Sequence, residues 1–430
     1  MEKTKDTNEV RKAFIIFCLV GMISTIIFLV YTRGEGLNKI FFRDSMDTGM
    51  DFFHSIEYIN GNAPYEKFGT LYPPLANLFF AVLFMFVPQW QYVNWGKTFE
   101  EGIALRGSRV DLRVWQPTMI LFILFITVTS IAFYMIVQIC LKNIKRNKLI
   151  SVLLVFSYPI VYALERGNII LISVFLCMFY LIYFDTSNKL LKEVALIALA
   201  LSAGLKIYPA IFGMLLIYNR QWKEALRTVV YGVMSFILPF FVFKEKLSGL
   251  FIFIHQLSDF GKITELTCSG TSFDRMLNSD IYIISKFLSV SLDGEQVIKY
   301  TCVFNYIIVV ILLLSGVILK ERWKQVLICA LSIILLSSQG IYILSFILCP
   351  MVYFIKEVMI LNRENFVYLL GMVGLIIFLP LAVETDAIIV PQYVRIHIFM
   401  WILLIAIVFN VFCVIRKRLL LRRSNRAVKI

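Results

Sequence analysis

The chain has 430 residues, of which 60% are hydrophobic and 16% are charged, and its formal net charge is +14. A soluble globular domain has about 45–50% apolar and about 25% charged residues, so this composition excludes an ordinary soluble protein. Apolar runs long enough to cross the roughly 30 Å hydrocarbon core recur from end to end. The runs lack the alternation of barrel strands and therefore predict membrane-spanning helices.

The positive charge lies mostly beside the apolar runs, which is the positive-inside pattern of membrane proteins. It gathers at residues 142–148 and 416–430, and residues 1–12 carry four further cations. We therefore predict cytoplasmic tails at 1–12 and 416–430 and expect no nucleic-acid partner. A basic role at the membrane surface is the alternative interpretation of the same charges.

The first apolar run, residues 13–31, predicts an uncleaved span, because it is too long for a typical signal-peptide core. The polar, glycine-rich stretch 32–71 then follows as an outer loop. Counting every run as a span gives an odd number, although both tails are predicted inside. Either residues 72–90 cross only partly, or the connection after the run 115–141 is inner rather than outer.

Three later apolar runs are each interrupted by polar residues and read as helical hairpins. They are 150–184, interrupted at 165–168; 194–219, interrupted at 206–209; and 326–355, interrupted at 337–340. Each arm has about 13 to 16 residues and reaches roughly 20–24 Å, less than the hydrocarbon thickness. Polar backbone at that depth must be buried or line a wet cavity. The apexes therefore predict an outward-facing intramembrane cavity.

The remaining apolar runs predict further spans, with a mixed-charge outer loop at 244–300. These spans are 228–243, 303–319, 366–383 and 396–415. The sequence thus predicts an all-α polytopic membrane protein of about 12 transmembrane helices, forming a single domain over residues 1–430. A multi-pass location in a membrane follows from this pattern.

The first outer loop carries three carboxylates at helical spacing, Asp44, Asp47 and Asp51, followed by apolar residues from Phe52 to Ile59. On a helix the acids share one face and the apolar residues another. This pattern predicts an interfacial helix that presents its acids to the mouth of the cavity. A solvated acidic face near a helix N-terminus would give the same pattern.

The aspartate loop continues with G-N-x-P-Y at residues 61–65 and Y-P-P-L at residues 72–75. Together these motifs resemble the first outer loop of the polyprenol-phosphate-mannose-dependent mannosyltransferases, within the C-type glycosyltransferase superfamily. That family's glycine-glutamine-x-asparagine motif is similar to residues 165–168 here, and its lysine-x-x-proline pattern to residues 206–209. The third apex departs from the family, because residues 337–342 lack the histidine that relatives often carry. The second half of the chain matches only in hydropathy.

The resemblance implies transfer of a sugar, with mannose the best-known one, from a polyprenyl-phosphate donor to a glycan or glycolipid acceptor of the cell envelope. It implies an active site on the outer face of a bacterial-type plasma membrane and inversion at the anomeric carbon. A hydroxyl nucleophile needs a positioned base, and the matching positions are Asp47, which we prefer, and Asp44. Arg166 and Lys206 are the expected cations for the donor phosphate. Alternatively, Arg166 neutralises Glu165.

Six further residues are candidate substrate contacts, on the same resemblance or on their place in the outer loops. They are Asp51, Tyr72, Asn168, Tyr208, Arg275 and Arg395. Membrane lipid is the other expected partner, and the sequence shows no feature that requires a metal or another cofactor.

Two other classes of protein share this body plan. A polysaccharide polymerase or ligase acting on diphosphate-linked oligosaccharides would rely on outer-loop arginines rather than on an acidic helix. A lipid-linked sugar transporter or flippase would show two repeated halves with broken helices at matching positions. The three hairpins are not spaced as two halves, which favours the transferase.

Overall fold

A computed structural model of the chain consists of helices, since each regular element in its described part is an α-helix or a 3-10 helix. The structure describes residues 8–37, 48–87, 111–260, 270–290, 293–337, 340–378 and 391–427. The chain divides into two compact units. Unit 1 comprises Met1–Tyr31, Asn143–Arg146 and Ile263–Ile430, and unit 2 comprises Thr32–Lys142 and Asn147–Lys262. The predicted all-α fold is confirmed, whereas a single domain in the bilayer stays a prediction.

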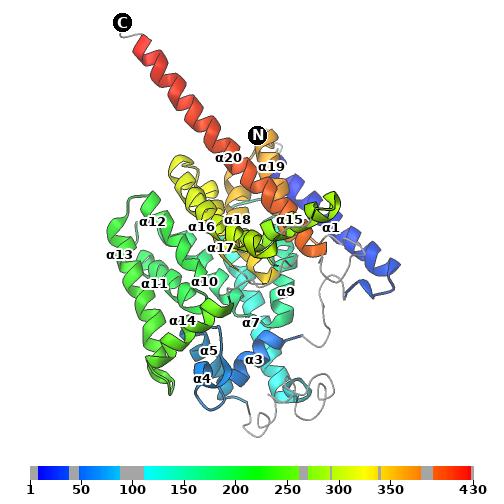
Figure 1. The fold of residues 1–430 in the computed structure, drawn as a ribbon, viewed down its shortest axis with the longest axis vertical. Coiled ribbons are helices and arrows are strands. Elements are labelled where there is room, and N and C mark those ends of the chain that lie inside the picture. Colours follow the sequence, from blue (N-terminus) through cyan, green and yellow to red (C-terminus); the bar gives the residue numbers. More distant parts are fainter. Residues whose placement is uncertain are drawn as a thin grey trace, which may run out of the picture. The chain divides into compact units, whose positions relative to one another are not determined.

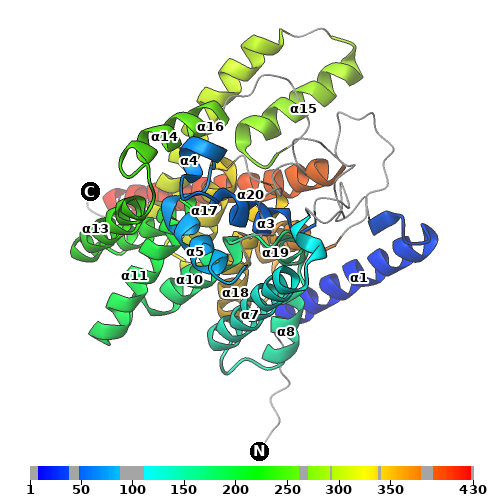
Figure 2. The ribbon, with the colours of Figure 1, turned by 90° about the horizontal axis from the view of Figure 1, so that it is seen from below.

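Unit 1 is built around two helices that are buried along almost their whole length, α17 (Arg322–Leu336) and α18 (Leu348–Glu357). The other elements of the unit are α1 (Glu9–Tyr31), α15 (Phe273–Leu288), α16 (Gly294–Ile318), the 3-10 helix η7 (Ile341–Ile347), α19 (Arg363–Ile376) and α20 (Pro391–Ala427). Helix α1 contacts α19, and α19 lies along the red α20 (Figure 1). Helices α15 and α16 lie side by side (Figure 2).

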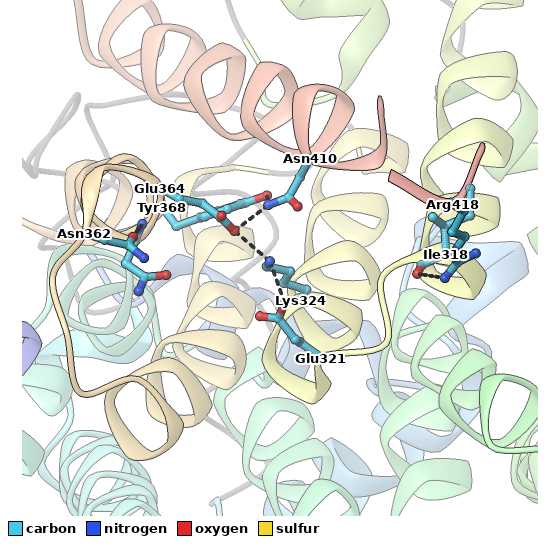
Figure 3. Close-up of polar contacts among 9 residues, drawn as sticks. Ile318, Glu321, Lys324, Asn362, Glu364, Tyr368, Asn410 and Arg418 are labelled. Atoms are coloured by element: carbon cyan, nitrogen blue, oxygen red, sulfur yellow. Dashed lines mark hydrogen bonds and ion pairs between the residues drawn. The ribbon is translucent and has the colours of Figure 1, made fainter. Parts of the chain in front are cut away.

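A buried lysine joins three helices of unit 1 (Figure 3). The Nζ of Lys324 on α17 donates to Glu321 at 2.9 Å and to Glu364 on α19 at 2.7 Å. Asn410 on α20 donates to the same Glu364 oxygen at 2.6 Å and to the Tyr368 hydroxyl at 3.3 Å. Because a buried charge is tolerated only when it is paired and hydrogen-bonded, this network fixes how α17, α19 and α20 pack.

Unit 2 contains the first outer loop and the first two interrupted runs. Its elements are α3 (Met50–Tyr58), α4 (Pro64–Phe68), α5 (Pro74–Phe84), η4 (Leu112–Val114), α7 (Gln116–Cys140), α8 (Asn147–Val155), α9 (Tyr158–Arg166), α10 (Ile170–Tyr183), α11 (Lys189–Leu205), η5 (Tyr208–Gly213), α12 (Met214–Tyr218), α13 (Trp222–Ile237), η6 (Leu238–Val242) and α14 (Ser248–Phe260). Helices α3, α4 and α5 lie together, and α11 packs between α10 and α13 (Figure 1).

An aromatic core holds α3 in place. Phe52 on α3 packs against Phe80 of α5 and against Phe122 and Phe125 of α7, with ring centroids 5.2–6.0 Å apart. The rings are tilted or edge-on to one another, the arrangements that aromatic pairs prefer. The buried face of α3 is therefore covered by protein, and this packing fixes the direction of its opposite, polar face.

Among the described residues, five helices are long and apolar enough to span a membrane, and a sixth span forms if α8 and α9, bent by 50°, count as one. The five are Glu9–Tyr31, Gln116–Cys140, Trp222–Val242, Gly294–Ile318 and Tyr393–Leu421. They make the chain a membrane-embedded protein and coincide with predicted spans, whereas a total of about 12 stays a prediction. Helix α5, within the predicted run 72–90, has 11 residues and is about 16 Å long, too short to cross alone.

All three predicted interruptions fall where helices end. Helix α9 ends at Arg166 and is followed by Gly167, whose φ of 65° is in the left-handed region. Helix α11 ends at Leu205 and is followed by Lys206 in an extended conformation. Helix α17 ends at Leu336, and η7 begins at Ile341. Glycine costs little at positive φ, and the extended φ and ψ of Lys206 do not fit an α-helix. The depth of these apexes in the bilayer and the outward cavity stay predictions.

Two segments expected as loop or tail are largely helical. The predicted outer loop 244–300 contains α14, α15 and the first turns of α16. Helix α20 continues to Ala427, through most of the predicted tail 416–430. Lysine and arginine are good helix formers, so the basic residues that mark the cytoplasmic side do not end the helix.

Candidate functional site

Asp51 lies on the polar face of α3. The neighbouring side chains of Phe52 and Phe53 are fully buried, whereas Asp51 is only partly buried. The described part of the aspartate loop thus has the two faces that the sequence predicts, while a position at the membrane interface stays a prediction. Asp47 and Asp44, the predicted catalytic bases, lie outside the described residues.

Arg166 forms an ion pair with Asp51, so neutralising Glu165 is not its only role. Its Nε lies 2.9 Å from Oδ2 of Asp51 and its Nη2 lies 3.0 Å from Oδ1, so the two side chains form a bidentate ion pair. Such pairs are strong and fix the plane of both groups. The pair is placed by the turn at Gly167, and the backbone N–H of Gly49 donates to the Glu165 carbonyl at 2.9 Å. The start of α3 is therefore tied to the turn that ends α9.

Asn168 is the second residue of this turn that holds the Asp51 carboxylate. Its Nδ2 donates to Asp51 Oδ2 at 2.6 Å and lies 3.4 Å from the Tyr72 hydroxyl. Its Oδ1 accepts from the backbone N–H of Ile170 at 2.9 Å. Since Asn168 is fully buried and held at both ends of its amide, it positions the carboxylate in one orientation.

Lys206 completes the cluster from the second interrupted run. Its side chain is 5% exposed, and its Nζ lies 4.2 Å from the centre of the Tyr72 ring. This is a cation–π contact in a desolvated place, where it is strongest. With Arg166 and Asp51, the described charged groups of the cluster sum to one net positive charge. We call Asp51, Tyr72, Arg166, Asn168 and Lys206 the charge cluster.

The charge cluster lowers the pKa of Asp51. Burial alone would raise this pKa, but the Arg166 charge, the hydrogen bonds from Arg166 and Asn168 and the Lys206 charge outweigh it. Two donors and two nearby cations all favour the ionised carboxylate. Asp51 is therefore an anion at neutral pH.

The other candidate contacts are spread over both units. Tyr208 opens η5, two residues after Lys206, and is half-buried. Arg275 lies on α15 of unit 1. Arg395 lies on α20, is fully buried, and its Nη1 donates to the Ile377 carbonyl at 2.6 Å. Contact of Tyr208, Arg275 and Arg395 with substrate stays a prediction.

The third apex belongs to unit 1 and is described only in part. Ser337 is fully buried and its carbonyl accepts from the Thr271 hydroxyl at 3.2 Å, while residues 338–339 lie outside the described part. His397 of α20 contacts Gly270, the residue before Thr271, with its Nε2 3.0 Å from the Gly270 carbonyl oxygen. A histidine therefore lies near Thr271 although the apex sequence itself has none.

The motif at residues 61–65 has a structural role that the sequence reasoning missed. The buried carboxylate of Glu245 accepts the backbone N–H groups of Tyr65 at 2.9 Å and Glu66 at 3.1 Å, at the start of α4. The Tyr65 hydroxyl then donates to the Tyr72 carbonyl at 3.2 Å. The motif thereby fixes the segment that carries Tyr72 into the charge cluster.

Glu57 is the second residue that was missed. It lies on the buried side of α3, next to Ile56, and burial raises its pKa to about 7, against the opposing effects of the Lys67 charge and an Asn60 hydrogen bond. The sequence signal that could have identified Glu57 is its position directly after the apolar Ile56 in an amphipathic helix.

Comparisons with known proteins add one match. The family model of glycosyltransferase family 87 matches residues 70–338, more than half of the chain. The matched region includes four residues of the charge cluster and begins after the three aspartates of the first outer loop. Neither a curated protein nor a solved structure matches the chain.

Proposed function

Because the chain belongs to glycosyltransferase family 87, we propose that it moves one sugar from a polyprenyl-phosphate donor to a hydroxyl of a cell-envelope glycan or glycolipid. Transfer takes place on the outer face of the plasma membrane and inverts the anomeric carbon, and mannose is the first sugar to test. The observation that supports this proposal is the charge cluster, in which two cations meet the carboxylate of the first outer loop.

The cations match the needs of the leaving group. As the sugar departs, negative charge grows on the lipid phosphate, and fixed cations in a place of low dielectric stabilise that charge without reorganisation. Arg166 is held in one plane by Asp51, and Lys206 is held against the Tyr72 ring. We assign both to the donor phosphate, with Asn168 and Tyr72 as neighbouring donors.

The acceptor hydroxyl needs a base, and an aspartate of the first outer loop supplies it. The sequence favours Asp47 and then Asp44. Among the described residues, Asp51 is a third candidate, because it is ionised and lies beside the cations that would hold the donor phosphate. An ionised carboxylate at that position takes the proton as the hydroxyl oxygen attacks the anomeric carbon and the phosphate leaves.

The experiment supplies the purified protein in lipid with a panel of radiolabelled polyprenyl-phosphate sugars and a membrane glycolipid extract. Wild type is compared with Asp44→Asn, Asp47→Asn and Asp51→Asn, and with Arg166→Met and Lys206→Met. Loss of the base should reduce turnover by about 10²–10⁴-fold, and loss of either cation by about 10²–10³-fold. Asp259→Asn, a half-exposed carboxylate on α14, is the matched control.

Each outcome decides something. A single aspartate variant that loses transfer but still binds donor names the base. If wild type transfers no sugar from any donor, the polyprenyl-phosphate donor is wrong, and diphosphate-linked oligosaccharides become the next substrates to test. If all three aspartate variants keep wild-type turnover, base catalysis from this loop is wrong.

A further inference from the structure

Unit 1 contains a cavity of about 370 Å³ at the N-terminal end of α1. Its lining residues are Asn8, Arg11, Lys12, Ile15, Lys145 and Arg146. Four of the six carry a positive charge and none is acidic. The volume lies in the range of small-ligand pockets, about 300–1,000 Å³, so the cavity has room for a phosphate-bearing headgroup.

Part of the lining is fixed by contacts with the end of α18 and with the segment that follows it. The Arg11 Nε donates to the Ile355 carbonyl at 3.3 Å, and the Asn8 Nδ2 lies 2.8 Å from the Met359 sulfur. Glu9, the nearest acid along the chain, accepts the backbone N–H of Leu361 at 3.0 Å and is not part of the lining. The acids among the described residues therefore do not line this cavity.

The other charged lining residues come from a loop in an uncommon conformation. Asn143 and Arg146 have φ values of 70° and 62°, in the left-handed region that residues with a side chain rarely adopt. Within this loop Lys145 and Arg146 are exposed to solvent and line the cavity. A local backbone cost of this kind persists only where the surrounding structure maintains it.

A concave, acid-free group of four cations attracts an anion with more than one negative oxygen. The surroundings favour a lipid over a solute, because Ile15 continues the cavity onto a face of α1 whose apolar side chains are exposed, including Ile16, Leu19 and Ile23. We propose that the cavity binds the phosphate headgroup of an anionic phospholipid whose acyl chains lie along α1. Basic pockets at the ends of membrane helices bind such headgroups.

The test uses full-length protein in neutral detergent. Phosphatidylglycerol, phosphatidylcholine or inorganic phosphate is titrated in, while native mass spectrometry counts retained lipids and the melting temperature is followed. The variant is Lys145→Ala with Arg146→Ala. The control is Lys142→Ala with Lys148→Ala, which removes the same charge from exposed positions beside the same loop but outside the lining. Lys12→Gln, an exposed lining residue on α1, is a second single variant.

We expect phosphatidylglycerol to be retained and to raise the melting temperature of wild type and control, with on the order of tenfold weaker binding in the variant. Lys12→Gln should weaken binding by several-fold. Equal losses in variant and control would show diffuse attraction to the basic loop and overturn the site. Equal retention of phosphatidylcholine would overturn headgroup recognition. If inorganic phosphate reproduces the stabilisation, the ligand is a soluble phosphate compound, and the lipid assignment is wrong.

Discussion

At the scale of single residues, the charge cluster is organised by one carboxylate. Asp51 accepts hydrogen bonds from Arg166 and Asn168 and lies within electrostatic reach of Lys206. None of these residues is near Asp51 in the sequence, so their common position depends on packing. Removing the carboxylate would take away the ion-pair partner of Arg166 and a nearby negative charge from Lys206, which is why its effect differs from that of an exposed acid.

The planar geometry of Arg166 is testable. In Arg166→Lys the single ammonium cannot make both bonds to Asp51, so we expect turnover with saturating donor to fall about tenfold or more, although the charge is kept. Arg227→Lys is the control, because the Arg227–Glu193 pair is 44% and 27% exposed and exposed pairs contribute little. Equal turnover in wild type and Arg166→Lys would mean that only charge matters at this position.

Glu57 predicts a pH dependence of stability. Its pKa rises from 4.5 to about 7 on folding, so the folded state holds a proton that the unfolded state has lost. Stability is therefore full below about pH 4.5 and falls as the pH rises to about 7. Glu57→Gln removes this loss, and its melting temperature should exceed that of wild type at about pH 8 and converge with it in acid. A constant difference at every pH would assign the effect to packing instead.

At the scale of elements, each interrupted helix ends for a local reason that the sequence shows. Polar residues within an apolar run mark the breaks at 165–168, 206–209 and 337–340, and the structure has helix ends at all three. The bend between α8 and α9 was not predicted, because it lies inside an apolar run where only Pro159 marks it. Helices α14 and α15 were missed because their mixed charge resembles that of a loop.

Gly167, which follows α9, has no room for a side chain. An added Cβ would lie 2.6 Å from the Phe52 Cβ and 2.7 Å from the Phe122 ring, at a φ of +65°. Gly167→Ala should lose about 2–4 kcal/mol of stability, from backbone strain and overpacking, and should reduce transfer by displacing Arg166. Thermal unfolding and turnover check this.

Gly232→Ala is the control for that substitution. Gly232 lies within α13, and its Cβ would meet nothing within 4 Å. The helix should therefore gain about 0.5–1 kcal/mol with transfer unchanged. If Gly167→Ala behaved like this control, the turn would not need glycine.

At the scale of the whole molecule, composition alone identified a membrane protein of helices, and family 87 membership agrees with the predicted transferase. The number of spans could not be fixed from the sequence, because apolar runs give hydropathy but not helix length. Run 72–90 illustrates this, since its described helix α5 has only 11 residues. The sequence predicted Asp51 only as a substrate contact, because no spacing rule relates Asp51 to Arg166, 115 positions away.

The predicted topology can be tested by labelling. In a cysteine-free background, exposed Glu66 in the first outer loop and exposed Lys142 in a basic connection are each replaced by cysteine. A membrane-impermeant maleimide should label Glu66→Cys in intact cells and Lys142→Cys only after the membrane is opened. Labelling of Lys142→Cys in intact cells would place that connection outside and change the span count.

The single net positive charge of the cluster has a consequence for turnover. The donor we propose, a sugar-bearing lipid phosphate, is a diester with one negative charge, which the net charge of Arg166, Lys206 and Asp51 would balance. After transfer the lipid phosphate would be a monoester with a charge of about −1.5 to −2 at neutral pH. A cluster with a net positive charge attracts this larger negative charge more strongly than it attracts the donor. The proposed function therefore predicts that the spent lipid phosphate competes with the donor as a product inhibitor.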